Sequence, residues 1–210
     1  MKTLSFVITS KCEEVCPYCF RTPQRDTSST EFKGLLARAI RDYPELSKIV
    51  ITGGNPELNP NFWDICKEVK AKGLRLKVHA NYSTKKTWSK YVKLASEVSI
   101  PIDSLFTKQP FRSPESSANF RKAFDYFLKK KVPVQVHTVV GKPNLKDTLE
   151  IYDFLKSKGF FLPGPNSWKL FRLVGVNELK EQELTDKEWF EVKKRFDGRN
   201  VKFVDNVLEY

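Results

Sequence analysis

The stretch Lys11-Cys12-Glu13-Glu14-Val15-Cys16-Pro17-Tyr18-Cys19 decides the interpretation of this chain. Its cysteines have the spacing C-x3-C-x2-C, so one short loop offers three thiolates. That ligand set suits a cubane 4Fe-4S cluster and leaves one iron without a protein ligand. An iron with an open position usually takes part in chemistry, so the loop predicts a reactive centre.

The pattern of apolar and amphipathic stretches along the chain predicts a parallel β/α fold. An apolar strand is expected at about 3–9, so the cysteines follow its C-terminal end, where active sites gather in such folds. Short apolar runs then alternate with amphipathic stretches of helix length, which is typical of β/α units. Further strands are expected at about 48–52, 74–80, 97–102, 133–140 and 167–173, and helices at about 31–42, 60–72, 84–95, 115–130, 146–158 and 186–196.

Six β/α units are too few for a complete eight-unit barrel. We therefore predict an α/β fold with a partial (β/α)6 TIM-like barrel. Residues 1–196 would form this core, and residues 197–210 an extension that covers the barrel, with an extended piece at Val201 to Val204. Local signals support the helix boundaries: capping boxes at Ser28/Glu31 and Thr185/Glu188, Asn59-Pro60 and Ser113-Pro114 at helix starts, and Gly73 and Gly159 after helix ends.

Composition restricts the partners and the compartment. The 210 residues carry a formal charge of +12, which favours an anionic partner, although lysine-rich helices can also be ordinary solvated surfaces. The N-terminal apolar run is too short for a signal peptide, and no run approaches the length of a membrane span. We expect a cytoplasmic protein whose thiols stay reduced. Cys66, on a predicted helix, is expected to be a buried core thiol.

Two other metal sites could use the same cysteines. A structural zinc site normally needs four ligands, and the imidazoles of His79 and His137 lie on other predicted strands. A passive electron-transfer cluster would need a fourth cysteine, and Cys66 is in the wrong place. A non-catalytic metal-binding module that contacts nucleic acid remains the alternative from another class.

The loop resembles the defining element of the radical S-adenosylmethionine (SAM) superfamily, C-x3-C-x2-C after the first strand. Tyr18 matches the aromatic residue that precedes the last cysteine in that family. The resemblance implies that Cys12, Cys16 and Cys19 hold a 4Fe-4S cluster whose fourth iron binds SAM. Reductive cleavage of SAM would give a 5′-deoxyadenosyl radical that abstracts hydrogen from a substrate.

Further segments resemble the SAM-binding segments of the same family. Gly53-Gly54-Asn55-Pro56, after the second strand, is similar to the G-G-E-P segment that binds the SAM amino group, with Asn55 in place of glutamate. Asn81 and Ser104 lie in segments similar to S-N-G-S and I-D-S. The resemblance therefore implies that Tyr18, Gly53, Gly54, Asn55, Asn81 and Ser104 bind the cofactor.

Within the superfamily, the second half resembles the viperin family, whose members dehydrate nucleoside triphosphates. Arg112 stands where those enzymes carry a phosphate-binding arginine, and Lys169 and Arg172 lie in a segment similar to the W-K-V-F-Q strand. His137 is a further substrate contact and a weak candidate for proton donation. Two departures stand against this resemblance, because Gln135 replaces a lysine and His137 an asparagine. Lys169 and Arg172 could instead face outward or pair with acids such as Asp103.

The predicted function is that of a radical SAM enzyme acting on an anionic substrate, with a viperin-like nucleotide reaction favoured. Flavodoxin or ferredoxin would be the reductant. The alternatives within the superfamily are a purine or pterin precursor, as in 7-carboxy-7-deazaguanine synthase, an RNA or a peptide. Peptide-modifying members often carry cysteine-rich C-terminal domains, which this sequence lacks.

Overall fold

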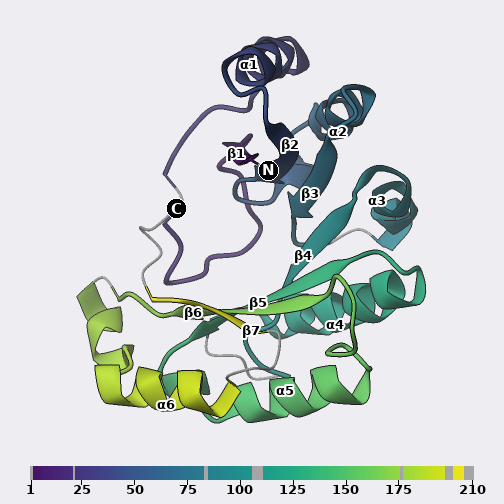
Figure 1. Cartoon of the computed structure of the whole chain (residues 1–210). Helices are drawn as coiled ribbons and strands as arrows, with labels where there is room; N and C mark the ends of the chain where they lie inside the picture. The colour runs from purple at the N-terminus through teal and green to yellow at the C-terminus, as the bar shows by residue number, and fades with distance from the viewer. Residues whose placement is uncertain are drawn as a thin grey trace. The chain divides into compact units, whose positions relative to one another are not determined.

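The computed structural model describes residues 2–20, 22–82, 85–105, 111–175, 177–196 and 201–205. Within them, seven strands form one sheet in the order β1-β2-β3-β4-β5-β6-β7 (Figure 1). A helix follows each of the first six strands, as the sequence predicts. The elements are β1 (Lys2–Val7), α1 (Ser29–Asp42), β2 (Leu46–Thr52), α2 (Phe62–Ala71), β3 (Arg75–His79), α3 (Trp88–Leu94), β4 (Glu97–Pro101), α4 (Pro114–Lys129), β5 (Val134–Val140), α5 (Asp147–Ser157), β6 (Ser167–Arg172), α6 (Asp186–Phe196) and β7 (Val201–Val204).

The chain divides into two compact units. The first contains Met1–Glu13, Phe20–Ser99 and Ala123–Pro133, and the second contains Glu14–Cys19, Ile100–Lys122 and Val134–Tyr210. The boundary runs through β4, α4 and the cysteine loop. Each unit is therefore described by itself.

In the first unit, β1, β2, β3 and the start of β4 pair in parallel. Alternate residues such as Ile49, Ile51 and Val78 are fully buried on the face that carries α1, α2 and α3 (Figure 1). An aromatic cluster beside these residues joins Tyr82, Tyr91 and Phe127, with ring centroids 5.0 to 6.0 Å apart. This apolar layer leaves the opposite face of the strands free for polar side chains.

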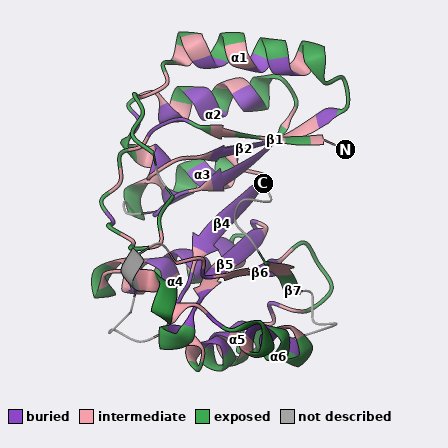
Figure 2. Ribbon diagram, turned by 90° about the vertical axis from the view of Figure 1, so that its left-hand side faces the viewer, coloured by how far each residue is buried: buried purple, intermediate pink, exposed green. Residues whose placement is uncertain are grey.

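In the second unit, β5, β6 and β7 also pair in parallel. Trp168 and Leu170 are fully buried on the face that carries α5 and α6, and the Trp168 ring lies 5.1 Å from that of Phe196. β5 is largely buried and β6 about half, β7 is partly exposed, and α5 and α6 expose one side of each helix (Figure 2). Both units therefore bury one face of their strands under amphipathic helices.

The predicted α/β class and the six β/α units are confirmed, and Val201–Val204 adds a seventh strand beside β6. Ser28 caps α1, and Thr185 and Glu188 cap each other at the start of α6. Asn59 also acts as a capping side chain, because its Oδ1 accepts from the backbone N–H of Asn61 at 2.8 Å. Its amide donates to the carbonyls of Ile8 and Thr27, and α2 itself begins at Phe62.

The boundary between a core of residues 1–196 and an extension of 197–210 stays a prediction, because residues 197–200 and 206–210 lie outside the described ranges. Among the residues that are described, no helix has both the length and the hydropathy needed to cross a membrane.

Candidate functional site

The start of the cysteine loop lies directly against the end of β2, within the first unit. Gly54 donates its backbone N–H to the carbonyl of Thr9 at 2.9 Å, and Asn55 donates its own to the carbonyl of Lys11 at 2.6 Å. A Cβ atom on Gly54 would lie 2.2 Å from the Lys11 oxygen, and one on Gly53, which has φ +153°, would lie 2.4 Å from the Thr9 oxygen. Only glycine permits this approach. The two glycines thus fix where the loop begins.

Neutral amides surround Cys12 in the same unit. The Asn81 side chain donates its Nδ2–H to the Cys12 sulfur at 3.4 Å. The Asn55 side chain is fully buried and donates to both carboxylate oxygens of Glu13, at 2.8 and 3.0 Å, while its Oδ1 accepts from the backbone N–H of Asn81. Asn55 therefore links the loop to the end of β3, and Glu13 supplies a carboxylate beside the position where related segments carry glutamate.

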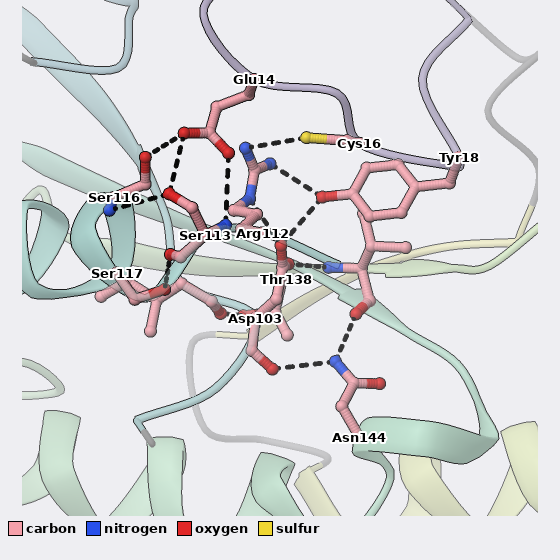
Figure 3. A network of polar contacts seen from close by, with 12 residues as sticks. Glu14, Cys16, Tyr18, Asp103, Arg112, Ser113, Ser116, Ser117, Thr138 and Asn144 are labelled. Carbon is pink, nitrogen blue, oxygen red and sulfur yellow. Dashed lines mark hydrogen bonds and ion pairs between the residues drawn. The ribbon is translucent and has the colours of Figure 1, made fainter. Parts of the chain in front are cut away.

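Buried charges surround Cys16 in the second unit (Figure 3). Arg112 donates from Nη1 to the Cys16 sulfur at 3.3 Å, from Nη2 to the Tyr18 hydroxyl at 2.8 Å, and from Nε to Asp103 Oδ2 at 2.7 Å. The Tyr18 hydroxyl donates to the same Asp103 oxygen at 2.8 Å. The side chains of Arg112 and Asp103 are only 12% and 1% exposed. The ion pair therefore lies almost entirely out of water.

Asp103 is itself fixed by β5 and the residues that follow it. Its Oδ1 accepts from the backbone N–H of Val139 at 2.8 Å, and its backbone carbonyl accepts from the buried Asn144 amide at 2.9 Å. Thr138 donates to the neighbouring carbonyl of Ile102 at 2.6 Å. The carboxylate that orients Arg112 therefore has little freedom to move.

Glu14 holds the same part of the loop at the N-terminus of α4. Its carboxylate accepts from the Ser113 hydroxyl and backbone N–H, at 3.2 and 3.3 Å, and from the Ser116 hydroxyl (Figure 3). Ser113 also caps α4 by accepting from the Ser116 backbone N–H, as predicted. A carboxylate is favourable at this end of a helix dipole. Glu14 was not predicted as a site residue.

The titration behaviour of these groups follows from burial. Burial raises the pKa of Cys16 to about 11, although Arg112 acts in the opposite direction. Burial and then Asp103 raise the pKa of Tyr18 well above its usual value, so its hydroxyl keeps the proton that it donates. Burial opposes the charge of Arg112, but Tyr18 and Asp103 outweigh it and raise its pKa. The guanidinium therefore stays charged.

The residues predicted to bind substrate lie in different places. His137 and Lys169 are opposite each other on β5 and β6, and Lys202 of β7 is the next residue in this row. His137 Nε2 lies 2.6 Å from Gln135 Oε1, and the Lys169 ammonium lies 5.0 Å from the Phe171 ring centroid. This row occupies the face of the strands opposite to Trp168 and Leu170.

Arg172 does not share that face. It lies three residues after Lys169 and binds Asp186 Oδ1 and the carbonyl of Leu184, both at 2.6 Å. Arg112 binds Asp103, so an incoming phosphate would compete with that carboxylate for the guanidinium. Lys169 and Arg172 therefore lie on opposite faces of β6 and do not form one phosphate site.

The remaining predicted residues are placed as follows. Ser104 is buried directly after Asp103, and Cys66 is a buried thiol of α2 whose pKa is raised by burial. Cys12, Cys16, Cys19 and Cys66 are not joined in disulfides. Within the described ranges, no three His, Cys, Asp or Glu side chains are already arranged around a metal position. Ser83, which belongs to the segment similar to S-N-G-S, lies outside those ranges.

The donors around the sulfurs fit a cluster. The Cys12 sulfur accepts a hydrogen bond from the amide nitrogen of Asn81, and the Cys16 sulfur accepts one from the guanidinium of Arg112. Both of these nitrogen groups are donors only. Hydrogen bonds to cysteine sulfurs are typical of iron–sulfur sites and stabilise thiolate ligands. Because metal binding deprotonates its thiol ligands, a raised thiol pKa is no obstacle once the metal is present.

Comparison with known proteins shows the family. Residues 6–155 match the radical SAM superfamily, so the chain belongs to this superfamily of enzymes, whose cofactors are a 4Fe-4S cluster and SAM. The match begins in β1 and includes the cysteine loop.

Two curated relatives and one solved structure illustrate the similarity. The chain is 34% identical over 85 residues to a tungsten-containing aldehyde ferredoxin oxidoreductase cofactor-modifying protein of Pyrococcus furiosus, covering 39% of this chain and 24% of that protein. It is 24% identical over 204 residues to an AdoMet-dependent heme synthase of Oleidesulfovibrio alaskensis, covering 91% and 51%. Streptococcus suis SuiB bound to precursor peptide SuiA superposes with a TM-score of 0.76 at 14% identity, covering 98% of this chain and 49% of SuiB.

The structural likeness identifies the fold as the partial barrel of radical SAM enzymes. This chain spans about half the length of the heme synthase and of SuiB, and its 85 matched residues cover about a quarter of the Pyrococcus protein.

Proposed function

We propose that this chain cleaves SAM reductively at a 4Fe-4S cluster held by Cys12, Cys16 and Cys19. The observation that carries the proposal is the pair of side-chain donors aimed at two of these sulfurs, from Asn81 to Cys12 and from Arg112 to Cys16. The cofactors together would supply a 5′-deoxyadenosyl radical that takes hydrogen from the substrate. Membership of the superfamily supports the same chemistry.

The chain's own residues would hold and orient these groups. Gly53 and Gly54 keep the start of the loop against β2, and Glu14 holds its middle on α4. Tyr18, Gly53, Gly54, Asn55, Asn81 and Ser104 are the residues that we propose for SAM. Asn55 lacks the charge of glutamate, and the Glu13 carboxylate bound to its amide supports a role beside the SAM ammonium. A reducing compartment such as the cytoplasm would keep the thiols available.

The substrate that we propose first is anionic, and a nucleotide remains the favoured candidate. His137, Lys169 and Lys202 form one row across β5, β6 and β7, so an anion bound over this face would meet the two lysines on neighbouring strands. The formal charge of +12 points the same way. Flavodoxin or ferredoxin is the proposed reductant.

The relatives favour a second class of substrate. One relative is named a heme synthase, and SuiB was solved with a precursor peptide. A carboxylated heme precursor would also present anions to Lys169 and Lys202, so the basic row is compatible with either substrate. The name of neither protein refers to the viperin family. A carboxylated heme precursor or a peptide is therefore the second proposal.

Cluster binding and SAM cleavage can be tested directly. The full chain is reconstituted anaerobically with iron and sulfide, reduced with dithionite and mixed with SAM. We expect a brown protein that contains about four irons per chain and that forms 5′-deoxyadenosine. Cys12→Ala, Cys16→Ala and Cys19→Ala should each lose both properties, whereas Cys66→Ala, a matched control on α2, should keep them. A colourless protein that binds zinc would overturn the proposal.

The substrate class requires a comparison of candidates under those conditions. Nucleoside triphosphates, a carboxylated heme precursor and a peptide are added separately, and 5′-deoxyadenosine is measured together with the modified substrate. Lys169→Gln with Lys202→Gln should raise KM for an anionic substrate at least several-fold, whereas Lys187→Gln, exposed on α6, should not. No turnover of any triphosphate would exclude the nucleotide proposal.

A further inference from the structure

The positively charged side chain of Arg112 contacts Cys16, a proposed cluster ligand. Its Nη1 lies 3.3 Å from the Cys16 sulfur, although the two residues are 96 positions apart. The contact is made by a side chain that is 12% exposed, so the guanidinium meets little competing water. Electrostatic interactions strengthen where water is excluded.

The other contacts of Arg112 fix its direction. Nε binds Asp103, Nη2 binds the Tyr18 hydroxyl, and the guanidinium carbon lies 5.5 Å from the Phe120 ring centroid. Asp103 and Tyr18 thus hold two of the three guanidinium nitrogens, and the third, Nη1, faces the sulfur. Asp103 is in turn held by Val139, as described above.

We propose that Arg112 is a positioning residue for the cluster: held by Asp103, it donates to the Cys16 sulfur and raises the reduction potential of the cluster bound there. Reduction adds negative charge that spreads onto the thiolate ligands, and a cationic donor stabilises that charged form. The proposal rests on the proposed function, because it requires Cys16 to be a cluster ligand. It gives Arg112 a role other than phosphate binding.

The two members of the ion pair should act on the potential in opposite directions. Removing the positive charge of Arg112 destabilises the reduced cluster, so its midpoint potential should fall. Removing the negative charge of Asp103 leaves more net positive charge beside Cys16, so the potential should rise. A purely structural role would not produce opposite signs.

The test is a redox titration of the reconstituted full chain without SAM, followed by electron paramagnetic resonance, with iron and sulfide measured for every sample. The variants are Arg112→Gln, Asp103→Asn and Arg195→Gln. The last makes the same charge change at an exposed position of α6. We expect a lower potential for Arg112→Gln, a higher one for Asp103→Asn and an unchanged one for Arg195→Gln.

The proposal is overturned if the potential of Arg112→Gln matches the wild type at equal iron content, or if Asp103→Asn lowers it. If Arg112→Gln does not retain the cluster, the sign of the shift in Asp103→Asn still decides. Tyr18→Phe adds a measurement without a charge change and should shift the potential less than Arg112→Gln. A wild-type chain that takes up no 4Fe-4S cluster would instead refute the proposed function itself.

Discussion

Around Cys12 the loop is held by backbone contacts and neutral amides, whereas around Cys16 it is held by buried charges. On the first side, glycines bring β2 against the loop, and Asn81 donates to the sulfur. On the second side, a charged guanidinium donates to the sulfur and is fixed by a carboxylate that is 1% exposed. The difference implies that the first half of the loop depends on shape, and the second half on electrostatics.

The largest expected effect comes from breaking the charged side. Asp103→Ala leaves the Arg112 guanidinium buried without a carboxylate, and removing one partner of a buried pair typically costs about 3–5 kcal/mol of unfolding free energy. Urea denaturation measures the loss. The exposed pair of Asp64 and Lys67 is the control, since Asp64→Ala should change stability little.

A double variant separates the unpaired charge from other effects of truncation. Asp103→Ala combined with Arg112→Met removes both charges, so it should recover part of the stability that Asp103→Ala loses. If the double variant loses as much stability as Asp103→Ala and Arg112→Met together, the ion pair is not what stabilises this side of the loop.

A steric clash alone should destabilise the side of the loop around Cys12. Gly54→Ala places a Cβ atom 2.2 Å from the Lys11 oxygen, and because backbone cannot move aside easily we expect a loss of about 1–3 kcal/mol. Gly34→Ala is the matched control on α1, where no atom lies within 4 Å of the added carbon. It should stabilise the protein by about 0.5–1 kcal/mol, because alanine favours helix. Urea denaturation of both variants should therefore give shifts of opposite sign.

The sequence predicted the first side of the loop better than the second. Cys12, Gly53 and Gly54 follow the ends of consecutive parallel strands, so their proximity follows from the β/α pattern. Asn81 was predicted from the resemblance of its segment, after the third strand, to the S-N-G-S segment of the family. Its contact with Cys12 is consistent with that placement.

The second side depends on contacts between residues far apart in the chain. Arg112 and Asp103 were both noticed, but as a phosphate ligand and as a possible partner of Lys169 or Arg172, and the observed Arg112–Asp103 pair was not foreseen. Glu14 was not predicted as a site residue at all. The hydrophobic periodicity of the sequence does not predict which carboxylate contacts Ser113 or which guanidinium contacts Cys16. Strand alternation alone, however, places Lys169 and Arg172 on opposite faces.

Buried charges also occur in the first unit, away from the cysteine loop. Lys77 and Lys48 bind the Glu97 carboxylate at 2.8 and 3.2 Å, at the start of β4, whereas the cysteine loop follows the end of β1. Burial opposes the charged carboxylate, but the two lysines outweigh it and lower the pKa of Glu97 below 4.5. Stability from this group is therefore present above that value and is lost as the pH falls through the lowered pKa.

Glu97→Gln tests this cluster. The variant should be less stable than the wild type at pH 7, and the difference should shrink as the pH falls through the lowered pKa of Glu97, where the wild-type carboxylate takes up its proton. Urea denaturation at a series of pH values measures it. Cluster uptake should be unchanged, because these charges lie at the other end of the strands; a loss of iron would show that the charges of the first unit also support the loop.

The smallest expected effect concerns the neutral hydrogen bond to Cys12. Asn81→Leu keeps a similar volume but removes the amide that lies 3.4 Å from the sulfur. Since a neutral donor is about half as strong as a charged one, the midpoint potential should fall by less than it does in Arg112→Gln. The titration is made without SAM, because Asn81 is also a proposed SAM residue. Equal shifts in the two variants would mean that the number of donors to sulfur, rather than the charge of Arg112, sets the potential, and the contrast between the two sides of the loop would then be one of geometry alone.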